Sequence, residues 1–337
     1  MSVAEAKESE AKRSETGGAV GKGWTVADIP SQAGRRVLIT GANSGIGYYA
    51  ALELARKGAH VLLACRDLAK GDAALERIRS EVPGASVEVV VIDLASLKSV
   101  CTFVGQELER EIPLDLLINN AGVMAPKNRQ KTADGFELQF GTNVLGHFAL
   151  TALLLPALER AAASKAQRPR VVTVASIAHK NGRLNFEDLQ SARSYSPMGA
   201  YQQSKLADLM FAFELDRRLR AAGAPKSGIM SVAAHPGVAG TSLFQGNDRS
   251  AVERLVRRGM RVAFNALLNT EAAGALPTLF AATAPGAVSG GYYGPQGFRE
   301  MRGGDVGLAQ VAPQAQDQAA ATRLWIECER LTGMSLL

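Results

Sequence analysis

A tyrosine and a lysine four residues apart form the pair in this sequence that is best suited to acid–base chemistry. Tyr201 and Lys205 lie in a helical pattern, roughly residues 199–221, so their side chains share one face of the helix. A phenol with an ordinary pKa of ~10 is a poor proton donor or base at neutral pH, but a nearby ammonium stabilises the phenolate. The spacing therefore predicts a tyrosine that works as a general acid or base.

Two further polar residues are candidates for the same site. Ser176 follows a run of apolar residues, and a hydroxyl at the carboxyl end of a strand faces the ligand crevice of an open α/β sheet. The alternative is a loop serine that caps a turn. Asn143 lies within a long helical pattern, roughly residues 133–160, although asparagine is a mediocre helix former. A role in the site and an ordinary surface position are both open for it.

A glycine-rich turn joins the first predicted strand to the first predicted helix. Residues 40–47 read Thr-Gly-Ala-Asn-Ser-Gly-Ile-Gly. Gly41 permits a tight turn, Gly45 permits close approach of a diphosphate, and Gly47 permits close packing of the helix. The N-terminus of that helix then presents free N–H groups to the phosphates. With a strand before it and a helix after it, the turn predicts a dinucleotide-binding site.

The end of the second predicted strand indicates which dinucleotide binds. NAD sites usually place a carboxylate there to accept hydrogen bonds from the ribose hydroxyls. Cys65 occupies that position, and Arg66, which follows it, suits a 2′-phosphate. Asp67 comes one or two positions late and could be a helix cap. We therefore expect NADP(H) rather than NAD(H), and the alternative is an exposed Arg66 that pairs with Asp67.

Apolar runs separated by helical patterns predict the scaffold that positions these residues. The runs cover residues 37–39, 60–65, 87–92, 114–118, 170–175 and 229–234, and a seventh follows at 291–293. Apolar strands that alternate with helices are typical of a parallel sheet with both faces covered. The predicted fold is α/β, a single-domain Rossmann-type doubly wound parallel sheet of about seven strands.

These motifs together resemble the short-chain dehydrogenase/reductase family. The turn has that family's Thr-Gly-x-x-x-Gly-x-Gly spacing, residues 119–122 read Asn-Asn-Ala-Gly, and residues 236–241 match Pro-Gly-x-x-x-Thr. The family's catalytic tetrad is matched in order by Asn143, Ser176, Tyr201 and Lys205. The resemblance extends over roughly residues 24–332.

The resemblance implies a role for each matched residue. Tyr201 would exchange the proton, Ser176 would bind the substrate oxygen, and Lys205 would bind the nicotinamide ribose. Asn143 would bend its helix and hold a water bonded to the lysine. Asp93 would hold the adenine amino group, and it or Ser96 could also cap the following helix. The expected cofactor-binding residues are Gly41, Asn43, Ser44, Gly45, Ile46, Gly47, Arg66, Asp93, Leu94, Asn120, Ala121, Gly122, Tyr201, Lys205, Pro236, Gly237 and Thr241.

Several segments are similar to a narrower branch that includes retinol dehydrogenases, the WW-domain oxidoreductase and protochlorophyllide reductase. They are residues 64–67, 132–137, 142–148 and 204–207, and the 25-residue step from Ser176 to Tyr201 fits the retinol dehydrogenase-like members. The branch implies an NADP(H)-dependent oxidoreductase that acts on a carbonyl or alcohol of an apolar substrate, such as an aldehyde, a ketone or a retinoid-like compound. Reduction of an activated C=C bond is one alternative, and a catalytically silent NADP(H)-binding sensor or scaffold is another.

Composition and charge weigh against other classes. The chain has 337 residues, of which 47% are hydrophobic and 21% charged, as in globular proteins. Three cysteines without a Cys-x-x-Cys motif and four scattered histidines predict neither a disulfide framework nor a metal site. A net charge of +6 is too small to imply nucleic acid as a partner. We expect a cytoplasmic protein, because the apolar runs fall short of a ~20-residue membrane span and the N-terminus lacks a signal peptide's apolar core.

Two regions add to the predicted domain of residues 24–337. Residues 1–23 have almost no large apolar side chains and are expected to be a flexible tail. A substrate lid is expected at about residues 238–285, with an amphipathic helix at 249–268. Its cationic stripe consists of Arg254, Arg257, Arg258 and Arg261. The stripe is either a solvated face or a weak contact with an anionic membrane or an acyl carrier. A homo-oligomer is also expected from the family.

Overall fold

Eight strands of the described residues form one sheet in the order β3-β2-β1-β4-β5-β6-β7-β8. The structure is a computed structural model that describes residues 23–164, 167–238 and 269–337. The strands are β1 (Arg36–Thr40), β2 (His60–Cys65), β3 (Val87–Val91), β4 (Leu116–Asn119), β5 (Arg170–Val174), β6 (Met230–Ala234), β7 (Tyr292–Pro295) and β8 (Val306–Leu308). The first seven are parallel, and β8 pairs antiparallel with β7.

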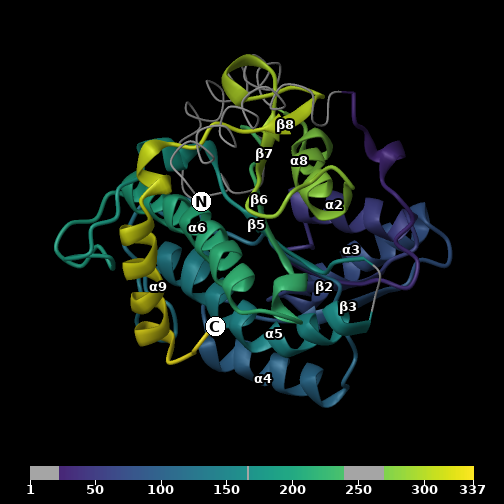
Figure 1. Ribbon diagram of the computed structural model, residues 1–337, viewed down its shortest axis with the longest axis horizontal. Coiled ribbons are helices and arrows are strands. Elements are labelled where there is room, and N and C mark those ends of the chain that lie inside the picture. The colour runs from purple at the N-terminus through teal and green to yellow at the C-terminus, as the bar shows by residue number, and fades with distance from the viewer. Residues whose placement is uncertain (1–22, 165–166, 239–268) are drawn as a thin grey trace, which may run out of the picture.

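Helices cover both faces of this sheet (Figure 1). They are α2 (Gly45–Arg56), α3 (Leu68–Glu81), α4 (Leu97–Glu109), α5 (Gly146–Ser164), α6 (Pro197–Ala221), α8 (Glu271–Thr283) and α9 (Gln318–Thr332). Successive strand residues point to opposite faces. Leu38 and Leu62 therefore pack under α4, α5 and α6, whereas Ile39 and Leu63 pack under α2, α3 and α8. α9 lies against α6.

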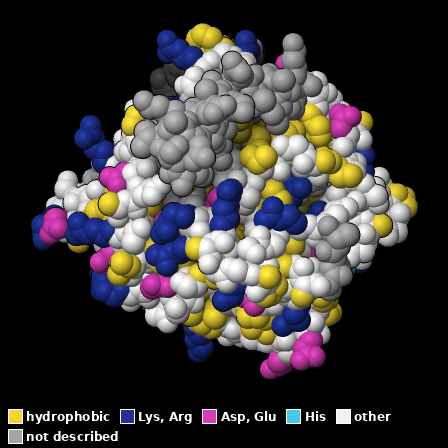
Figure 2. Space-filling model, in the orientation of Figure 1, with side chains coloured by type: hydrophobic (Ala, Val, Ile, Leu, Met, Phe, Trp, Pro, Cys, Tyr) yellow, Lys and Arg dark blue, Asp and Glu magenta, His cyan; other side chains and the backbone are white. Residues whose placement is uncertain are grey.

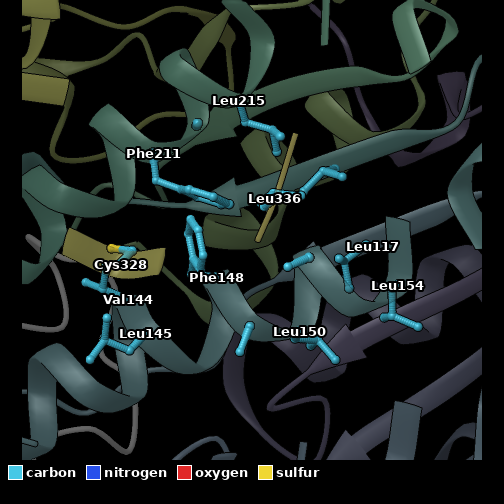
Figure 3. Packing of buried hydrophobic residues seen from close by; sticks show 14 of the residues in the cluster. Leu117, Val144, Leu145, Phe148, Leu150, Leu154, Phe211, Leu215, Cys328 and Leu336 are labelled. Carbon is cyan, nitrogen blue, oxygen red and sulfur yellow. The ribbon is translucent and has the colours of Figure 1, made fainter. Parts of the chain in front are cut away.

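An aromatic cluster fixes α5 against α6 and α9. The ring centroid of Phe148 lies 5.7 Å from that of Phe211 and 5.2 Å from that of Trp325. Figure 3 shows Phe148 and Phe211 pointing toward each other, with Cys328 of α9 beside them. All four side chains are buried. α6 also carries Tyr201 and Lys205, and the segment that enters α5 carries Asn143. This cluster therefore fixes the positions of the predicted catalytic residues relative to one another.

The strand order changes direction between β1 and β4. β1 pairs with β2 on one side and with β4 on the other, so the connections from β1 and from β4 lead away from each other. In open α/β sheets, ligands bind at such a point, outside the carboxyl ends of the strands. The glycine-rich turn leaves β1 at this point.

The predicted fold class is confirmed, and so are the seven predicted strands. The eighth strand was not predicted, because Val306-Gly307-Leu308 is too short to show an alternating pattern. The predicted start of the long helix at residue 133 is wrong. Residues 132–136 form a turn in which Gly135 has φ +89°, and helical structure begins at residue 138. Asp134 in this turn accepts a hydrogen bond from the Leu97 N–H at the start of α4 (3.0 Å).

One described segment, Phe140–Ala163, is long and apolar enough to cross a membrane by length and composition, although we expected no run of that kind. In this fold 83% of its most apolar window is buried inside the molecule, as in a core helix. Figure 2 shows basic and acidic side chains spread together over the visible face.

Several predictions concern residues 1–22 and 239–268, which lie outside the described residues. They are most of the tail, the arginine stripe and Thr241. The last part of the expected lid is not a lid, because residues 271–283 form α8, most of whose residues are buried against the sheet and α2. Contact of residues 249–268 with a membrane or an acyl carrier, homo-oligomer formation and the cytoplasmic location stay predictions.

Candidate active site

A cleft of about 790 Å³ opens at the carboxyl ends of strands β1 to β6. It brings together most of the residues that the sequence singled out. Its lining includes Gly41, Asn43, Ser44, Gly45, Ile46, Gly47, Arg66, Asp93, Leu94, Asn120, Ala121, Gly122, Ser176, Tyr201, Lys205, Pro236 and Gly237. Asn143 is not part of the lining.

The glycine-rich turn has the shape of a phosphate cradle. Gly41 has φ +67°, a conformation that favours glycine, and a Cβ on Gly47 would lie 2.5 Å from both Asn120 Nδ2 and Gly41 O. The Ser44 side chain makes no cap hydrogen bond at the start of α2. By contrast, side chains cap the other α-helices whose N-cap is described: Asp67 for α3, Ser96 for α4, Ser196 for α6, Thr270 for α8 and Asp317 for α9. The first N–H groups of α2 are thus left for an anion in the cleft, which fits a dinucleotide diphosphate.

A buried hydrogen-bond network fixes the ends of β1 and β4 on either side of this turn. Thr40 Oγ1 accepts hydrogen bonds from the N–H groups of Asn120 and Ala121, both at 2.9 Å, and Asn120 Nδ2 donates to Thr40 O (2.8 Å). His147 Nδ1 lies 2.8 Å from Asn143 O and must donate to it, so His147 Nε2 accepts the Thr40 hydroxyl at 2.9 Å. Burial lowers the pKa of His147 to about 3, which keeps the ring neutral. Sequence reasoning missed His147, because its partner Thr40 lies 107 residues away in the chain, on β1.

Basic side chains gather where the 2′-phosphate is expected. Arg66, Lys70 and Arg77 all line the cleft, and Cys65 at the end of β2 offers no carboxylate. Asp67 Oδ1 accepts the Lys70 N–H at 3.2 Å and so caps α3, as one of our alternatives had it. Within the described residues Asp67 forms an ion pair with Lys70 (3.6 Å) and none with Arg66. Sequence reasoning missed Lys70 and Arg77, although their i, i+7 spacing places them on one face of α3.

Asp93 and Asn119 have separable roles at the ends of β3 and β4. Ser96, not Asp93, caps α4, because Ser96 Oγ accepts the Ser99 N–H at 3.3 Å. Asp93 Oδ1 accepts the Ala95 N–H (3.0 Å), and the residue stays on the cleft lining. Asn119 is buried and donates from Nδ2 to Thr151 Oγ1 (3.0 Å) in the core, so it is a structural residue.

Ser176, Tyr201 and Lys205 line one part of the cleft. Ser176 follows β5, and its Oγ accepts the Ala178 N–H at 3.2 Å, so the hydroxyl proton remains free to donate. Lys205 Nζ donates to Val174 O (2.9 Å) and to Asp208 Oδ2 (2.8 Å). Burial alone would lower the pKa of the Lys205 ammonium, but the Asp208 carboxylate and then Tyr201 outweigh it and hold that pKa above its usual value.

Asn143 lies behind the residues that line the cleft, and its hydrogen bonds connect Val123, after β4, to Ser204 on α6. It sits in a π-helical segment, Phe140–Leu145, immediately before α5, and the bend that the resemblance implies stays a prediction. Its Oδ1 accepts the Val123 N–H (2.8 Å), and its Nδ2 donates to Val123 O (3.0 Å) and Ser204 Oγ (2.9 Å). A Cβ on Gly122 would lie 3.4 Å from Asn143 Oδ1 and 3.8 Å from Lys205 Nζ, so both groups border the same small space. The water that Asn143 is expected to hold stays a prediction.

A Rossmann-type sheet whose switch point carries both a phosphate cradle and a Tyr–Lys pair defines the class of dinucleotide-dependent oxidoreductases. The family model described as short chain dehydrogenase matches residues 35–252. The chain belongs to the short-chain dehydrogenase family, whose members use NAD(P)(H).

Individual relatives support the narrower branch. Retinol dehydrogenase 13 of Homo sapiens is 41% identical over 90% of this chain and 87% of its own length. Polyprenol dehydrogenase of Mus musculus is 40% identical over 90% of this chain and 86% of its own length. The crystal structure of an uncharacterised protein from Mycobacterium paratuberculosis has a TM-score of 0.73 and 41% identity, covering 94% of this chain and all of that one. The resemblance to retinol dehydrogenases is thus confirmed.

Proposed function

We propose that this protein is an NADP(H)-dependent carbonyl reductase or alcohol dehydrogenase that acts on an apolar substrate. The observation that carries the proposal is the placement of Ser176, Tyr201 and Lys205 in the same cleft as the glycine-rich turn. A phosphate cradle alone would fit many nucleotide-binding proteins. A proton-transfer pair in the same cleft is what a hydride-transfer enzyme needs.

The chain's own residues divide the work of binding and proton transfer. The turn of residues 41–47 would hold the diphosphate, and Lys205 the nicotinamide ribose. When bound, the nicotinamide supplies or accepts the hydride. Ser176 donates a hydrogen bond through its hydroxyl to the substrate oxygen, which orients that oxygen and favours negative charge on it. Tyr201 gives a proton to this oxygen during reduction and takes one from the alcohol during oxidation, while the Lys205 ammonium stabilises the phenolate.

The substrate class rests on the lining and on the relatives. Val123, Met124, Ile177 and Val238 line the cleft together with the catalytic residues. Two of the relatives carry names that specify long apolar alcohols, retinol and polyprenol. An apolar aldehyde, ketone or long-chain alcohol is therefore the substrate class that we propose.

The proposal is tested by following NADPH oxidation against aldehydes, ketones, quinones and retinal, with NADH in parallel. We expect turnover with at least one apolar carbonyl compound and a clear preference for NADPH. Product analysis distinguishes carbonyl reduction from reduction of an activated C=C bond. No turnover across the panel, together with tight NADPH binding by calorimetry, would favour the silent sensor instead.

Replacement of Arg66 tests the cofactor preference. We expect Arg66→Ala to raise the KM for NADPH by about 10- to 100-fold, because a charge-assisted hydrogen bond to the 2′-phosphate is lost. The KM for NADH should stay nearly unchanged. The matched control is Arg79→Ala, on the outer part of α3, where Arg79 pairs with Glu76 at 3.7 Å. An equal loss for both cofactors would contradict a role in 2′-phosphate binding.

A further inference from the structure

The ammonium of Lys205 has a buried counter-ion that the proposed reaction does not require. Asp208 Oδ2 lies 2.8 Å from Lys205 Nζ, and the two side chains are only 4% and 6% exposed. Asp208 follows Lys205 by three residues on α6, so both side chains lie on one face of the helix. Val174 O takes a second N–H of the ammonium. One of the three N–H groups is left for the cleft, which Lys205 lines.

The groups around the pair come from three helices. On α6 itself, Tyr201 faces Lys205. From α5, His147 lies close enough for the Lys205 charge to contribute to its lowered pKa. From α9, buried Cys328 faces Asp208, and burial followed by the Asp208 charge raises the pKa of its thiol. Figure 3 shows this part of α9 against the aromatic core. Both histidine and thiol are therefore neutral, which leaves Lys205 and Asp208 as the charges that face each other.

Burying a carboxylate among apolar helices is costly, so its presence needs an explanation. Burial raises the pKa of Asp208 to about 6, although the Lys205 ammonium opposes this. Above that pH both groups are ionised and compensate each other. A fully buried lysine without such a partner tends to lose its proton, because burial disfavours the charged form. A neutral Lys205 could not stabilise a phenolate.

We propose that Asp208 is a positioning residue that keeps Lys205 protonated and holds its ammonium at the edge of the cleft. The role rests on the proposed function, because it matters only where Lys205 serves Tyr201 and the cofactor. Asp208 acts through Lys205 and touches neither substrate nor cofactor. The Val174 carbonyl fixes the ammonium from the β5 side, and Asp208 supplies the charge that a carbonyl lacks.

The proton on Lys205 can be observed directly by NMR of lysine labelled with ¹³C at Cε, without any substrate. Lys205→Arg assigns the signal. We expect Asp208→Asn, which keeps a hydrogen-bond acceptor but removes the charge, to lower the titration midpoint of Lys205 by about two pH units or more. Asp208→Glu should restore it. An unchanged midpoint in Asp208→Asn would overturn the proposal.

The matched control is Asp216→Asn, further along the same helix. Asp216 pairs with Arg220 at 2.9 Å, and its side chain is 12% exposed. It lies roughly 22 Å along the helix from Tyr201, too far to act on the cleft. We expect this variant to leave the Lys205 signal unchanged. A similar shift in both variants would also contradict a specific role of Asp208.

The unmodified protein provides a second readout that does not depend on how a variant folds. Its Lys205 signal should also respond around pH 6, where burial places the pKa of Asp208. No response there would overturn the coupling. With an active substrate, the activity of Asp208→Asn should fall as the pH rises through the lowered titration midpoint of Lys205. The unmodified enzyme should keep its activity over that pH range, because its Lys205 stays protonated there. If no substrate is turned over, the proposed function fails while the NMR titration still tests Asp208.

Discussion

Tyr201→Phe is expected to reduce kcat by about 1,000-fold while NADPH still binds and the fold stays intact. The change removes one oxygen, and general acid–base catalysis by a positioned side chain contributes 10²–10⁴-fold. The Tyr201 hydroxyl makes no hydrogen bond to another residue in the part of the chain that the structure describes, and its ring is half-buried at the cleft. Phenylalanine therefore fits the same space without leaving a buried polar group unsatisfied.

The measurement combines steady-state turnover, NADPH titration by calorimetry and thermal unfolding. Tyr48→Phe is the matched control, because the Tyr48 hydroxyl donates to Glu81 Oε1 (3.0 Å) and Tyr48 is a residue of α2 whose side chain is buried in the core. We expect this control to lose about 1 kcal/mol of stability and to keep its turnover, the opposite pattern. If Tyr201→Phe retained most of its activity, Tyr201 would not be the proton donor.

The sheet and the placement of the site at its edge could be predicted from the sequence, because both follow from local patterns. An apolar run such as residues 60–65 predicts a buried strand, and the shared direction of parallel strands brings their carboxyl ends to one edge of the sheet. The glycine turn, Ser176 and Tyr201 each follow or flank such a run, so their convergence follows from topology. The turn at residues 132–136 could not be distinguished from the start of a helix, because its helical pattern continues into a true helix.

The supporting contacts could not be predicted, because they depend on which surfaces meet. Lys205 and Asp208 have the same i, i+3 spacing as Glu327 and Arg330 on α9, and both pairs have an N···O distance of 2.8 Å. Sequence spacing cannot distinguish them. The α9 pair is partly exposed, with the Arg330 side chain at 64%, whereas the α6 pair is enclosed. Only the packing of α5 and α9 around α6 turns an ordinary helical pair into a buried one.

Lys205→Met is the second change with a large expected effect, on stability as well as on turnover. We expect kcat to fall by about 1,000-fold, because the phenolate of Tyr201 loses its stabilising charge. The free energy of unfolding should fall by about 3–5 kcal/mol near pH 8, because the Asp208 carboxylate is left buried without a counter-ion. Urea denaturation at a series of pH values measures this loss directly.

The loss should depend on pH in a defined direction. Without the ammonium, burial acts unopposed, so the pKa of Asp208 in the folded variant should rise above about 6, while its value in the unfolded chain stays near 3.8. A carboxyl with a raised folded-state pKa is neutral in both states below the unfolded value, so no penalty applies there. Stability is then lost as the pH rises from about 4 through the folded-state pKa. Lys205→Met should therefore be closest to the unmodified protein at the acid end of its folded range.

A double variant separates stability from chemistry at this pair. Replacement of a buried ion pair by apolar residues of similar volume is often neutral or stabilising, whereas removal of one partner is not. Lys205→Met/Asp208→Leu should therefore recover most of the stability that Lys205→Met loses, at every pH, and remain inactive. Recovery without activity would mean that the stability of the fold does not require the two charges, whereas turnover in the cleft does. If the double variant were as unstable as Lys205→Met, the loss would come from the missing lysine side chain and its bond to Val174 O, not from an unpaired carboxylate.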